Sequence, residues 1–539
     1  MKKIFLLLLL PFFLIILLAT TLTDDFEIAK NLELFSNIYK EVNIYYVDET
    51  DPELLVYAGL EDMLKHMDPY CDFIPADEVK KYQSSLTENY TGLGTQVSII
   101  NEYPRIDELY ENGPAAKAGL KVGDIITSLD GIDAQGISMS EFSKKARGLE
   151  ATILTISVLR NGNKINDIAV KRGTIYTPNT PYYGLLKNEV GYIVLSSFTE
   201  NAAKNVQNAL LELKQKSNLK GLVLDLRFNT GGLLNEAVQL ASLFIPKGSL
   251  VVNTRGTNKS LEKNYKTTQS PIDTDIPLIV LINETSASAS EIVAGSLQDY
   301  DRAVILGSKS FGKGLVQHVF DLPYGAKVKL TTSKYYLPSG RCIQSKFYQN
   351  GKEQELADSL KENFKTMQGR IVVDAAGIIP DISNNNELFY SLLKDPVYTT
   401  LKYNFAVQFT NQNKVADPAN FQFTDAQFID FIKYAENAEL SQLDKNLNFL
   451  QEIESSSKEE GFKKVLDLLP ELKKKKLIST LELIKKFPKE IRFDLQQRIV
   501  LHTHFQKGRI INSISFDPLI EQACSTITNK KYLSILQKN

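Results

Sequence analysis

Three serines and a lysine carry the chemistry that this sequence offers. Ser286, Ser288 and Ser290 lie within residues 277–317, and Lys313 stands further along the same segment between two glycines. A serine hydroxyl attacks a carbonyl carbon only when a base removes its proton. A lysine can be that base when a tight, largely apolar setting lowers its pKa. The residue types therefore predict a serine nucleophile with a lysine base, and local chemistry does not choose among the three serines.

Histidine is the other residue type that could activate a serine. The chain has four histidines, and only His318 adjoins this segment. It stands in the alternating run 315–320, where a strand residue facing an edge is the simpler interpretation. Lys313 has the better setting, because its two flanking glycines let the backbone pass closely and Phe311 and Leu315 can exclude water.

The segment around the serines is predicted to be a strand, a tight turn and a helix. Residues 278–282 form an unbroken apolar run, as in a strand buried on both faces. Small residues follow at 285–288, and residues 289–297 are helix formers with apolar positions on one face. The turn therefore exposes a side chain near backbone N–H groups that have no helical partner and can stabilise an oxyanion.

The run from Ser286 to Gln317 resembles the signature of the carboxy-terminal processing peptidases, also called tail-specific proteases. In that family a Ser–Lys dyad is used, and the nucleophile precedes Ala-Ser-Glu. The resemblance identifies Ser288 as the nucleophile and Lys313, at 313 − 288 = 25 positions later, as the base. It also implies supporting roles for three further residues, which are Gln317, Glu291 and Asp299.

A second part of the resemblance lies upstream, after the apolar strand predicted over 221–226. The residues that follow are RFNTGG at 227–232, and a helix is predicted over 233–244. The family has an Asp-Leu-Arg-x-Asn-x-Gly-Gly element here, which gives one backbone N–H to the oxyanion hole. The donors implied are Ala289 and either Gly231 or Gly232. Without the resemblance, the pattern predicts only a strand-to-helix turn.

Residues 89–173 change to short alternating strands with glycine turns and resemble a PDZ domain. The matching stretches include YTGLGTQV at 90–97 and GPAAKAGLKVGDII at 113–126. Such domains accept an extended peptide as an added strand, and backbone N–H groups of a loop hold its terminal carboxylate. The resemblance implies that substrate tails bind through Gly92, Leu93, Gly94 and Val97. A purely structural sandwich is the alternative.

Alternating strands and helices over residues 174–385 indicate an α/β core. The runs 190–195 and 221–226 predict buried strands on either side of an amphipathic helix at 199–215. The resemblance continues to GIIPD at 377–381. It implies an α/β fold in a multi-domain chain that is α+β overall, with a crotonase-like core, an inserted PDZ-like β-sandwich and helical regions at both ends.

The two ends of the chain differ from this core. Residues 1–22 have two lysines and then an apolar run, which is typical of a signal peptide or membrane anchor. Residues 23–88 predict short helices, which the resemblance links to dimerisation, although a helical cap on the next domain is an equal explanation. Residues 386–539 are rich in Lys, Leu and Glu and predict a helical domain. That domain could cover the catalytic cleft, hold an adaptor or support an oligomer.

Composition narrows the function further. The formal net charge of −2 argues against a nucleic-acid surface. The three cysteines, Cys71, Cys342 and Cys524, are too few and too scattered for a disulfide framework or a metal cluster. We therefore expect no structural metal, and the implied chemistry needs no organic cofactor.

These observations predict an exported serine endopeptidase of the cell envelope that cleaves proteins near their carboxy-terminal tails. We expect it in the periplasm, or anchored in the membrane and facing outside the cytoplasm. Besides its substrates, its partners could include a second copy or an adaptor protein. The main alternative is a catalytically silent envelope protein that binds or scaffolds through its PDZ domain. An acyl-CoA enzyme of related core architecture is a second alternative, but it would need an acidic acid–base pair and no export signal.

Overall fold

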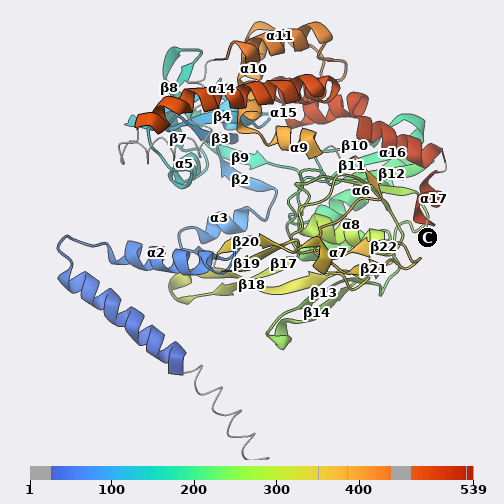
Figure 1. Ribbon diagram of the computed structural model, residues 1–539, viewed down its shortest axis with the longest axis horizontal. Helices are drawn as coiled ribbons and strands as arrows, with labels where there is room; N and C mark the ends of the chain where they lie inside the picture. The colour runs from blue at the N-terminus through green and yellow to red at the C-terminus, as the bar shows by residue number, and fades with distance from the viewer. Residues whose placement is uncertain (1–25, 350, 385–386, 439–462, 530, 538–539) are drawn as a thin grey trace, which may run out of the picture. The chain divides into compact units, whose positions relative to one another are not determined.

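Contacts divide the chain into two units, whose elements Figure 1 labels in order. The computed structural model describes residues 26–349, 351–384, 387–438, 463–529 and 531–537. The first unit takes residues up to 75 together with 319–330 and 348–352, and the second unit takes the rest. The expected signal or anchor segment at 1–22 lies outside the described residues. No helix within the described ranges is both long and apolar enough to cross a membrane.

The first unit is helical with a small strand pairing. It contains a helix over 26–45 and α2 (Pro52–Lys65), where the sequence predicts only short helices. Asp51 caps α2, because its carboxylate accepts the N–H groups of Glu53 and Leu54. The strand β1 (Asp72–Ile74) pairs antiparallel with the first residues of β18 (Lys327–Tyr336).

The PDZ-like region of the second unit is a six-stranded sheet with two helices. Its strands run in the order β3-β4-β5-β7-β8, and β6 pairs with β5. The bounds are β3 (Thr95–Ile100), β4 (Tyr103–Leu109), β5 (Ile125–Leu129), β6 (Ile132–Asp133), β7 (Ile153–Arg160), β8 (Asn163–Lys171), α4 (Pro114–Lys117) and α5 (Met139–Ala146). β2 (Asn89–Gly92) pairs with β9 (Gly173–Tyr176), so the chain enters and leaves this region side by side. β3 is an edge strand of its sheet, free to accept an added strand.

The core of the second unit is a six-stranded sheet in the order β10-β11-β12-β15-β16-β23. Its strands are β10 (Tyr182–Leu185), β11 (Val190–Val194), β12 (Gly221–Asp225), β15 (Leu278–Ile282), β16 (Val304–Gly307) and β23 (Ile382–Ser383). All neighbours from β11 to β23 are parallel, and only β10 runs antiparallel. The predicted α/β fold class is confirmed, and the strand predicted at 278–282 is β15.

Each face of this sheet is covered by a different set of helices. Alternate strand residues such as Leu224 and Val280 face α6 (Ala202–Lys216), α7 (Leu234–Ala241) and α8 (Ala289–Asp299). The intervening residues, such as Val223 and Leu281, pack against α16 (Pro518–Thr528) and α17 (Lys531–Leu536). Both faces of the sheet are therefore buried, and this is why the strands are continuous apolar runs in the sequence. Figure 1 shows α16 beside β12, and both α16 and α17 contact β16.

The carboxy-terminal region is helical in its described residues. Its remaining helices are α9 (Glu387–Leu393), α10 (Pro396–Gln412), α11 (Asp425–Glu436), α14 (Lys463–Lys486) and α15 (Pro488–Phe516). They share a core of their own, rich in phenylalanine and leucine. Residues 439–462, which the leucine spacing also predicts to be helical, lie outside the described residues.

Candidate active site

The serine turn lies between β15 and α8, at the carboxyl edge of the central sheet. Ser288 immediately precedes α8 and has φ 55° and ψ −113°. A residue with a side chain rarely adopts a positive φ, and such a conformation persists only where its surroundings over-determine it. Strain of this kind gathers at functional sites, and here it falls on one of the three candidate serines.

Burial and hydrogen bonding distinguish the three serines that local chemistry leaves equal. The Ser286 hydroxyl is buried and donates to the Leu226 carbonyl over 2.8 Å. The Ser290 hydroxyl is also buried and donates to the Asn229 carbonyl over 2.8 Å. Ser288 alone of the three is partly exposed. Two hydroxyls thus fasten this turn to the neighbouring strand-to-helix turn, and Ser288 is the one that solvent can reach.

Glu291 ties the serine turn to the lysine loop. Its side chain is fully buried, and one carboxylate oxygen accepts both the Ser288 N–H, over 2.8 Å, and the Lys313 N–H, over 2.9 Å. The other oxygen accepts the Ser310 hydroxyl and the Gly312 N–H. Burial raises the pKa of Glu291 to about 7, although these hydrogen bonds favour the ionised form. The acidic residue expected to support the site is therefore in contact with both halves of the expected dyad.

The loop that carries Lys313, here called the lysine loop, needs its glycines because Gln344 and Ser345 pass close to it. A Cβ atom on Gly312, where φ is +87°, would lie 2.1 Å from the Ser345 hydroxyl oxygen. A Cβ atom on Gly314 would lie 2.7 Å from the Gln344 backbone nitrogen. Lys313 is held between these two close approaches and is itself partly buried. Of the two residues expected to exclude water from it, Leu315 is buried and Phe311 is 36% exposed.

Tyr335 joins the two residues of the expected dyad a second time. It lies on β18 with 1% of its surface exposed. Its hydroxyl lies within hydrogen-bond distance of the Ser288 carbonyl oxygen, at 3.2 Å, and of the Lys313 carbonyl oxygen. Glu291 and Tyr335 thereby both fix the backbone of Ser288 relative to that of Lys313.

The glycine turn after β12 lies directly against Ser288. A Cβ atom built on Gly231 would lie 2.9 Å from the Ser288 Cβ and 3.0 Å from the Ala289 nitrogen. The Gly231 N–H already donates to the Asn229 side chain over 2.9 Å. Gly232 pairs with Phe198 in a parallel β-bridge. The hydrogen bonds of this bridge join the Phe198 N–H to the Gly231 carbonyl and the Leu233 N–H to the Phe198 carbonyl. The Gly232 N–H makes neither bond and points away from Phe198. The expected oxyanion donors therefore come from two turns, which meet at Gly231 and Ala289.

The other expected supporting residues lie further from the serine. Gln317 is on β17 (Leu315–Asp321), and its amide nitrogen donates to Thr331. Asp299 ends α8, eleven residues after Ser288 and so about 16 Å away along the axis. Its buried carboxylate forms an ion pair with Arg341 at 2.8 Å. Asp299 therefore holds the segment after β18 and does not touch the serine turn.

His318 lies on β17, as the alternation of that run predicts. One of its ring nitrogens is 2.6 Å from the Thr332 hydroxyl on β18. The ring thus takes part in the pairing of two strands.

The expected peptide-binding residues line one cavity beside the edge strand β3. It has a volume of about 130 Å³ and is bounded by the 92–97 loop on one side and α5 on the other. Leu93 is almost fully buried, and Phe142 of α5 forms part of the opposite wall. Arg147, just after α5, also lines the cavity and lies over the Tyr90 ring. The cavity thus combines a free strand edge, apolar walls and a cation.

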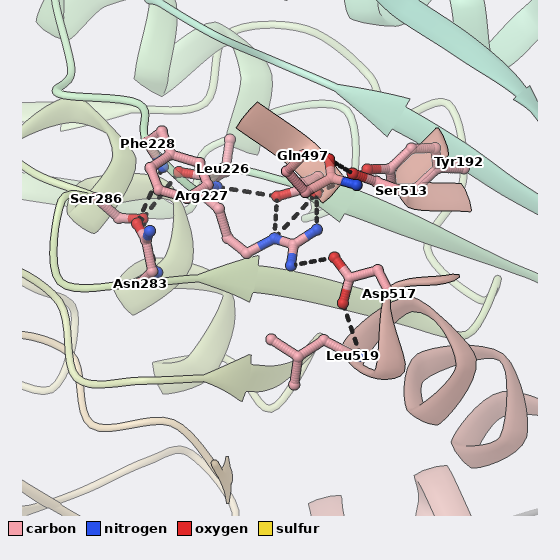
Figure 2. Close-up of polar contacts among 11 residues, drawn as sticks. Tyr192, Leu226, Arg227, Phe228, Asn283, Ser286, Gln497, Ser513, Asp517 and Leu519 are labelled. Atoms are coloured by element: carbon pink, nitrogen blue, oxygen red, sulfur yellow. Dashed lines mark hydrogen bonds and ion pairs between the residues drawn. The ribbon is translucent and has the colours of Figure 1, made fainter. Parts of the chain in front are cut away.

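An ion pair from the carboxy-terminal region reaches the strand-to-helix turn that carries the glycines. Figure 2 shows Arg227 facing Asp517, beside Asn283 and Ser286 of the serine turn. The Arg227 guanidinium contacts Asp517 at 2.6 Å and Asp225 at 2.6 Å. Burial opposes the charge of Arg227, but the two carboxylates outweigh it and hold its pKa above the usual value.

Sequence reasoning missed four residues that build this site. Tyr335 and Asp517 carry no local signal, because each meets the site only through long-range packing. Arg147 lies inside the predicted PDZ-like segment at 89–173 but has no distinguishing pattern. Asn229 had a signal, since it stands inside the RFNTGG element, and its fully buried side chain both accepts from Gly231 and donates to Leu195.

Three family models match successive parts of the chain. Residues 189–356 match peptidase family S41, residues 105–160 match a PDZ domain, and residues 389–527 match a family described as "Probable PDZ-protease, C-terminal helical domain". The sequence resemblance to carboxy-terminal processing peptidases is confirmed.

Curated relatives carry the same assignment over longer stretches. A carboxy-terminal-processing protease of Bartonella bacilliformis is 37% identical over 319 residues, which cover 58% of this chain and 73% of that protein. A probable CtpA-like serine protease of Staphylococcus aureus is 31% identical over 441 residues, covering 78% of this chain and 85% of that protein. Among solved structures, a photosystem II D1 C-terminal processing protease aligns with 25% identity and a TM-score of 0.39, covering 66% of this chain and 93% of that one.

Proposed function

The chain belongs to peptidase family S41 and is a serine peptidase of the carboxy-terminal-processing type, and we propose that Ser288 is its nucleophile and Lys313 its general base. One observation carries this assignment. Of the three clustered serines, Ser286 and Ser290 donate buried hydrogen bonds to backbone carbonyls. Ser288 alone of the three is partly exposed and has a strained backbone. Glu291 and Tyr335 both bridge its backbone to that of Lys313.

The proposed reaction follows the usual course of acyl transfer. Neutral Lys313 takes the proton of the Ser288 hydroxyl as the oxygen attacks the scissile carbonyl carbon. The lysine then gives that proton to the leaving amine. A water molecule hydrolyses the acyl-enzyme, with the lysine again as the base. Gln317 is proposed to orient the lysine amine, as the family resemblance implies.

The oxyanion is proposed to bind between two backbone N–H groups. Ala289 gives one, at the first turn of α8, where the N–H groups have no helical partner. Gly232 is the better second donor, because the Gly231 N–H is used by Asn229. Each such donor contributes about 3 kcal/mol to stabilisation of the transition state.

The substrate tail is proposed to bind in the cavity between β3 and α5. The free edge of β3 offers main-chain hydrogen bonds to an added strand, and Leu93, Val97 and Phe142 offer apolar contact to the side chains. Gly92 and Gly94 lie at the loop that would hold the terminal carboxylate, and Arg147 adds positive charge there. Tails that end in an apolar residue fit this chemistry.

Export and self-association are further proposals. The lysines and apolar run of residues 1–22 support export to the cell envelope, either with cleavage or as a membrane anchor. The helix over 26–45 exposes several large apolar side chains, among them Ile28, Leu32, Phe35 and Ile38, which supports a homodimer or an adaptor contact. Cell fractionation and amino-terminal sequencing of the mature protein test the first proposal. Sedimentation of the purified protein tests the second.

Proteolysis of an unfolded model protein with an apolar carboxy-terminal tail tests the catalytic assignment. We expect the intact protein to cleave it, and Ser288→Ala and Lys313→Ala to lose cleavage while still binding the tail. The matched controls are Ser270→Ala and Lys309→Ala, which alter an exposed serine and an exposed lysine in the same unit. Retained cleavage in either dyad variant would refute the assignment, and absence of cleavage by the intact protein would favour a binding or scaffolding role.

A further inference from the structure

We infer that Asp517, in the carboxy-terminal helical region, is a positioning residue for the peptidase reaction, because it holds Arg227 and thereby the turn that presents the oxyanion donor. The inference rests on the proposed function of Ser288 and Gly232. It gives the helical region an indirect part in catalysis, through a residue that lies 290 positions from Arg227 in the chain.

All three guanidinium nitrogens of Arg227 donate to a carboxylate. Its Nε lies 3.0 Å from one Asp225 oxygen, and its Nη2 lies 2.6 Å from the other. Its Nη1 donates to Asp517 Oδ2 over 2.6 Å. Asp225 is itself fixed by the Tyr192 hydroxyl at 2.7 Å. Asp225 binds one side of the guanidinium through two hydrogen bonds, and Asp517 binds the other side (Figure 2). Together the two carboxylates fix the orientation of the arginine.

The backbone around Arg227 is continuous with the catalytic turn. The Leu226 carbonyl accepts from Ser286, and the Phe228 N–H donates to the Asn283 side chain over 3.0 Å. Asn229 accepts the Ala287 N–H and the Ser290 hydroxyl at its carbonyl. A shift of Arg227 would therefore move the residues that hold both sides of the oxyanion site.

This turn also carries strain that an outside contact must help to hold. Phe228 has a φ of +64°, which a residue with a side chain rarely adopts, whereas Gly231 and Gly232 take positive φ values without strain. Strained backbone relaxes when its restraints are removed. Arg509 of α15 lies over the Phe228 ring at 5.9 Å, so the helical region touches the turn at a second residue. The two contacts together explain how a remote region can keep the turn in its active form.

A conservative variant separates this role from a structural one. Asp517 also caps α16, because its Oδ1 accepts the Leu519 N–H over 2.9 Å. Asparagine caps helices as well as aspartate does, so Asp517→Asn keeps the cap and removes the charge that holds Arg227. Asp395 is a matched control. It caps α10 by accepting the Val397 N–H over 2.8 Å and pairs with Lys476 of α14, within the helical region itself.

The test is steady-state cleavage of a tail-bearing protein substrate, with thermal unfolding measured in parallel, for the intact protein, Asp517→Asn, Asp517→Glu and Asp395→Asn. We expect Asp517→Asn to lower kcat about ten- to a hundred-fold with KM unchanged, because misplacing a reacting group by an ångström costs about a hundred-fold. Asp517→Glu restores the carboxylate and should recover part of kcat. Asp395→Asn should shift the unfolding temperature by about as much as Asp517→Asn does, and it should leave kcat near that of the intact protein.

Two outcomes would overturn the inference while leaving the proposed function intact. One is an unchanged kcat in Asp517→Asn, and the other is an equal loss of kcat in Asp395→Asn. As an independent check, Asp517→Asn should cost no further kcat when added to Arg227→Lys, and a full additive loss would contradict the path through Arg227. If the intact protein does not cleave at all, the proposed function fails and the inference fails with it.

Discussion

At the residue scale, the site depends on a few buried polar groups that lock two turns and a loop together. Ser286, Ser290 and Asn229 fasten the serine turn to the glycine turn, while Glu291 and Tyr335 fasten it to the lysine loop. Buried hydrogen bonds of this kind are costly to leave unmade, so they fix geometry more than they add net stability. Ser288 and Lys313 are positioned by neighbours that do no chemistry themselves.

The raised pKa of Glu291 predicts a specific dependence of stability on pH. Its folded pKa is about 7, above the ordinary value of 4.5, so between these values the folded state binds more protons than the unfolded state. The contribution of Glu291 to stability is therefore greatest below pH 4.5 and declines as the pH rises through 7. The measurement is the free energy of unfolding from pH 4 to 9 for the intact protein and for Glu291→Gln. Because glutamine does not titrate, the unfolding free energy of the intact protein minus that of Glu291→Gln should fall as the pH rises from 4.5 to 7, and a difference that is constant over this range would contradict this account.

The sequence predicted the types of these residues but could not rank them by its local pattern. Three serines stand at alternate positions, and what separates them is whether the Leu226 and Asn229 carbonyls lie within reach. Those carbonyls come from a strand-to-helix turn about sixty residues upstream, so only the fold brings them near. The family resemblance chose Ser288 without that knowledge, and the hydrogen bonds give the physical reason for the choice.

At the element scale, edge strand β3 and helix α5 form the proposed recognition surface. β3 pairs with β4 on one side only, and α5 is held in place by the capping box between Ser138 and Glu141. The local pattern of strands, glycine turns and a short helix is enough to predict this arrangement. The position of Arg147 beside the 92–94 loop depends on how α5 packs, which no local pattern states.

A charge at the rim of this cavity should weaken binding of apolar tails without affecting the chemical step. Met139 is the first residue of α5, lines the cavity and is 45% exposed, so Met139→Glu should fold normally. We expect KM for a substrate with an apolar tail to rise several-fold and kcat to stay unchanged. Ile132→Glu is the control. Ile132 is an exposed apolar residue of β6, in the same sheet as β3, and it does not line the cavity. Equal effects of the two variants would show that the tail binds elsewhere.

At the scale of the whole molecule, the carboxy-terminal helices complete the catalytic core. The sequence predicted a helical region but left open whether it covers the cleft, holds an adaptor or supports an oligomer. In the structure, α16 and α17 cover the face of the central sheet that α6, α7 and α8 leave bare. The position of these two helices could not be predicted from the sequence, because an ordinary amphipathic pattern does not indicate which surface a helix covers.

Removing an apolar side chain from this interface should therefore destabilise the core as a whole. Ile527 of α16 packs against the start of β12, where a Cβ atom on Gly221 would lie 2.6 Å from it. We expect Ile527→Ala to cost about 2 to 5 kcal/mol in the free energy of unfolding. Denaturant unfolding followed by circular dichroism measures it. Leu533→Ala is the control, since Leu533 is an exposed residue of α17, and a loss as large as that of Ile527→Ala would argue against the interface.

The central claim is that Ser288 becomes nucleophilic because Lys313 takes its proton. The most direct measurement is reaction of the full-length protein with a fluorophosphonate, followed by mass spectrometry of its peptides to locate the adduct. We expect one adduct, on Ser288, in the intact protein and in Lys309→Ala, and a large loss of labelling rate in Lys313→Ala. An adduct on another serine, or labelling of Ser288 that is as fast without Lys313, would contradict the claim.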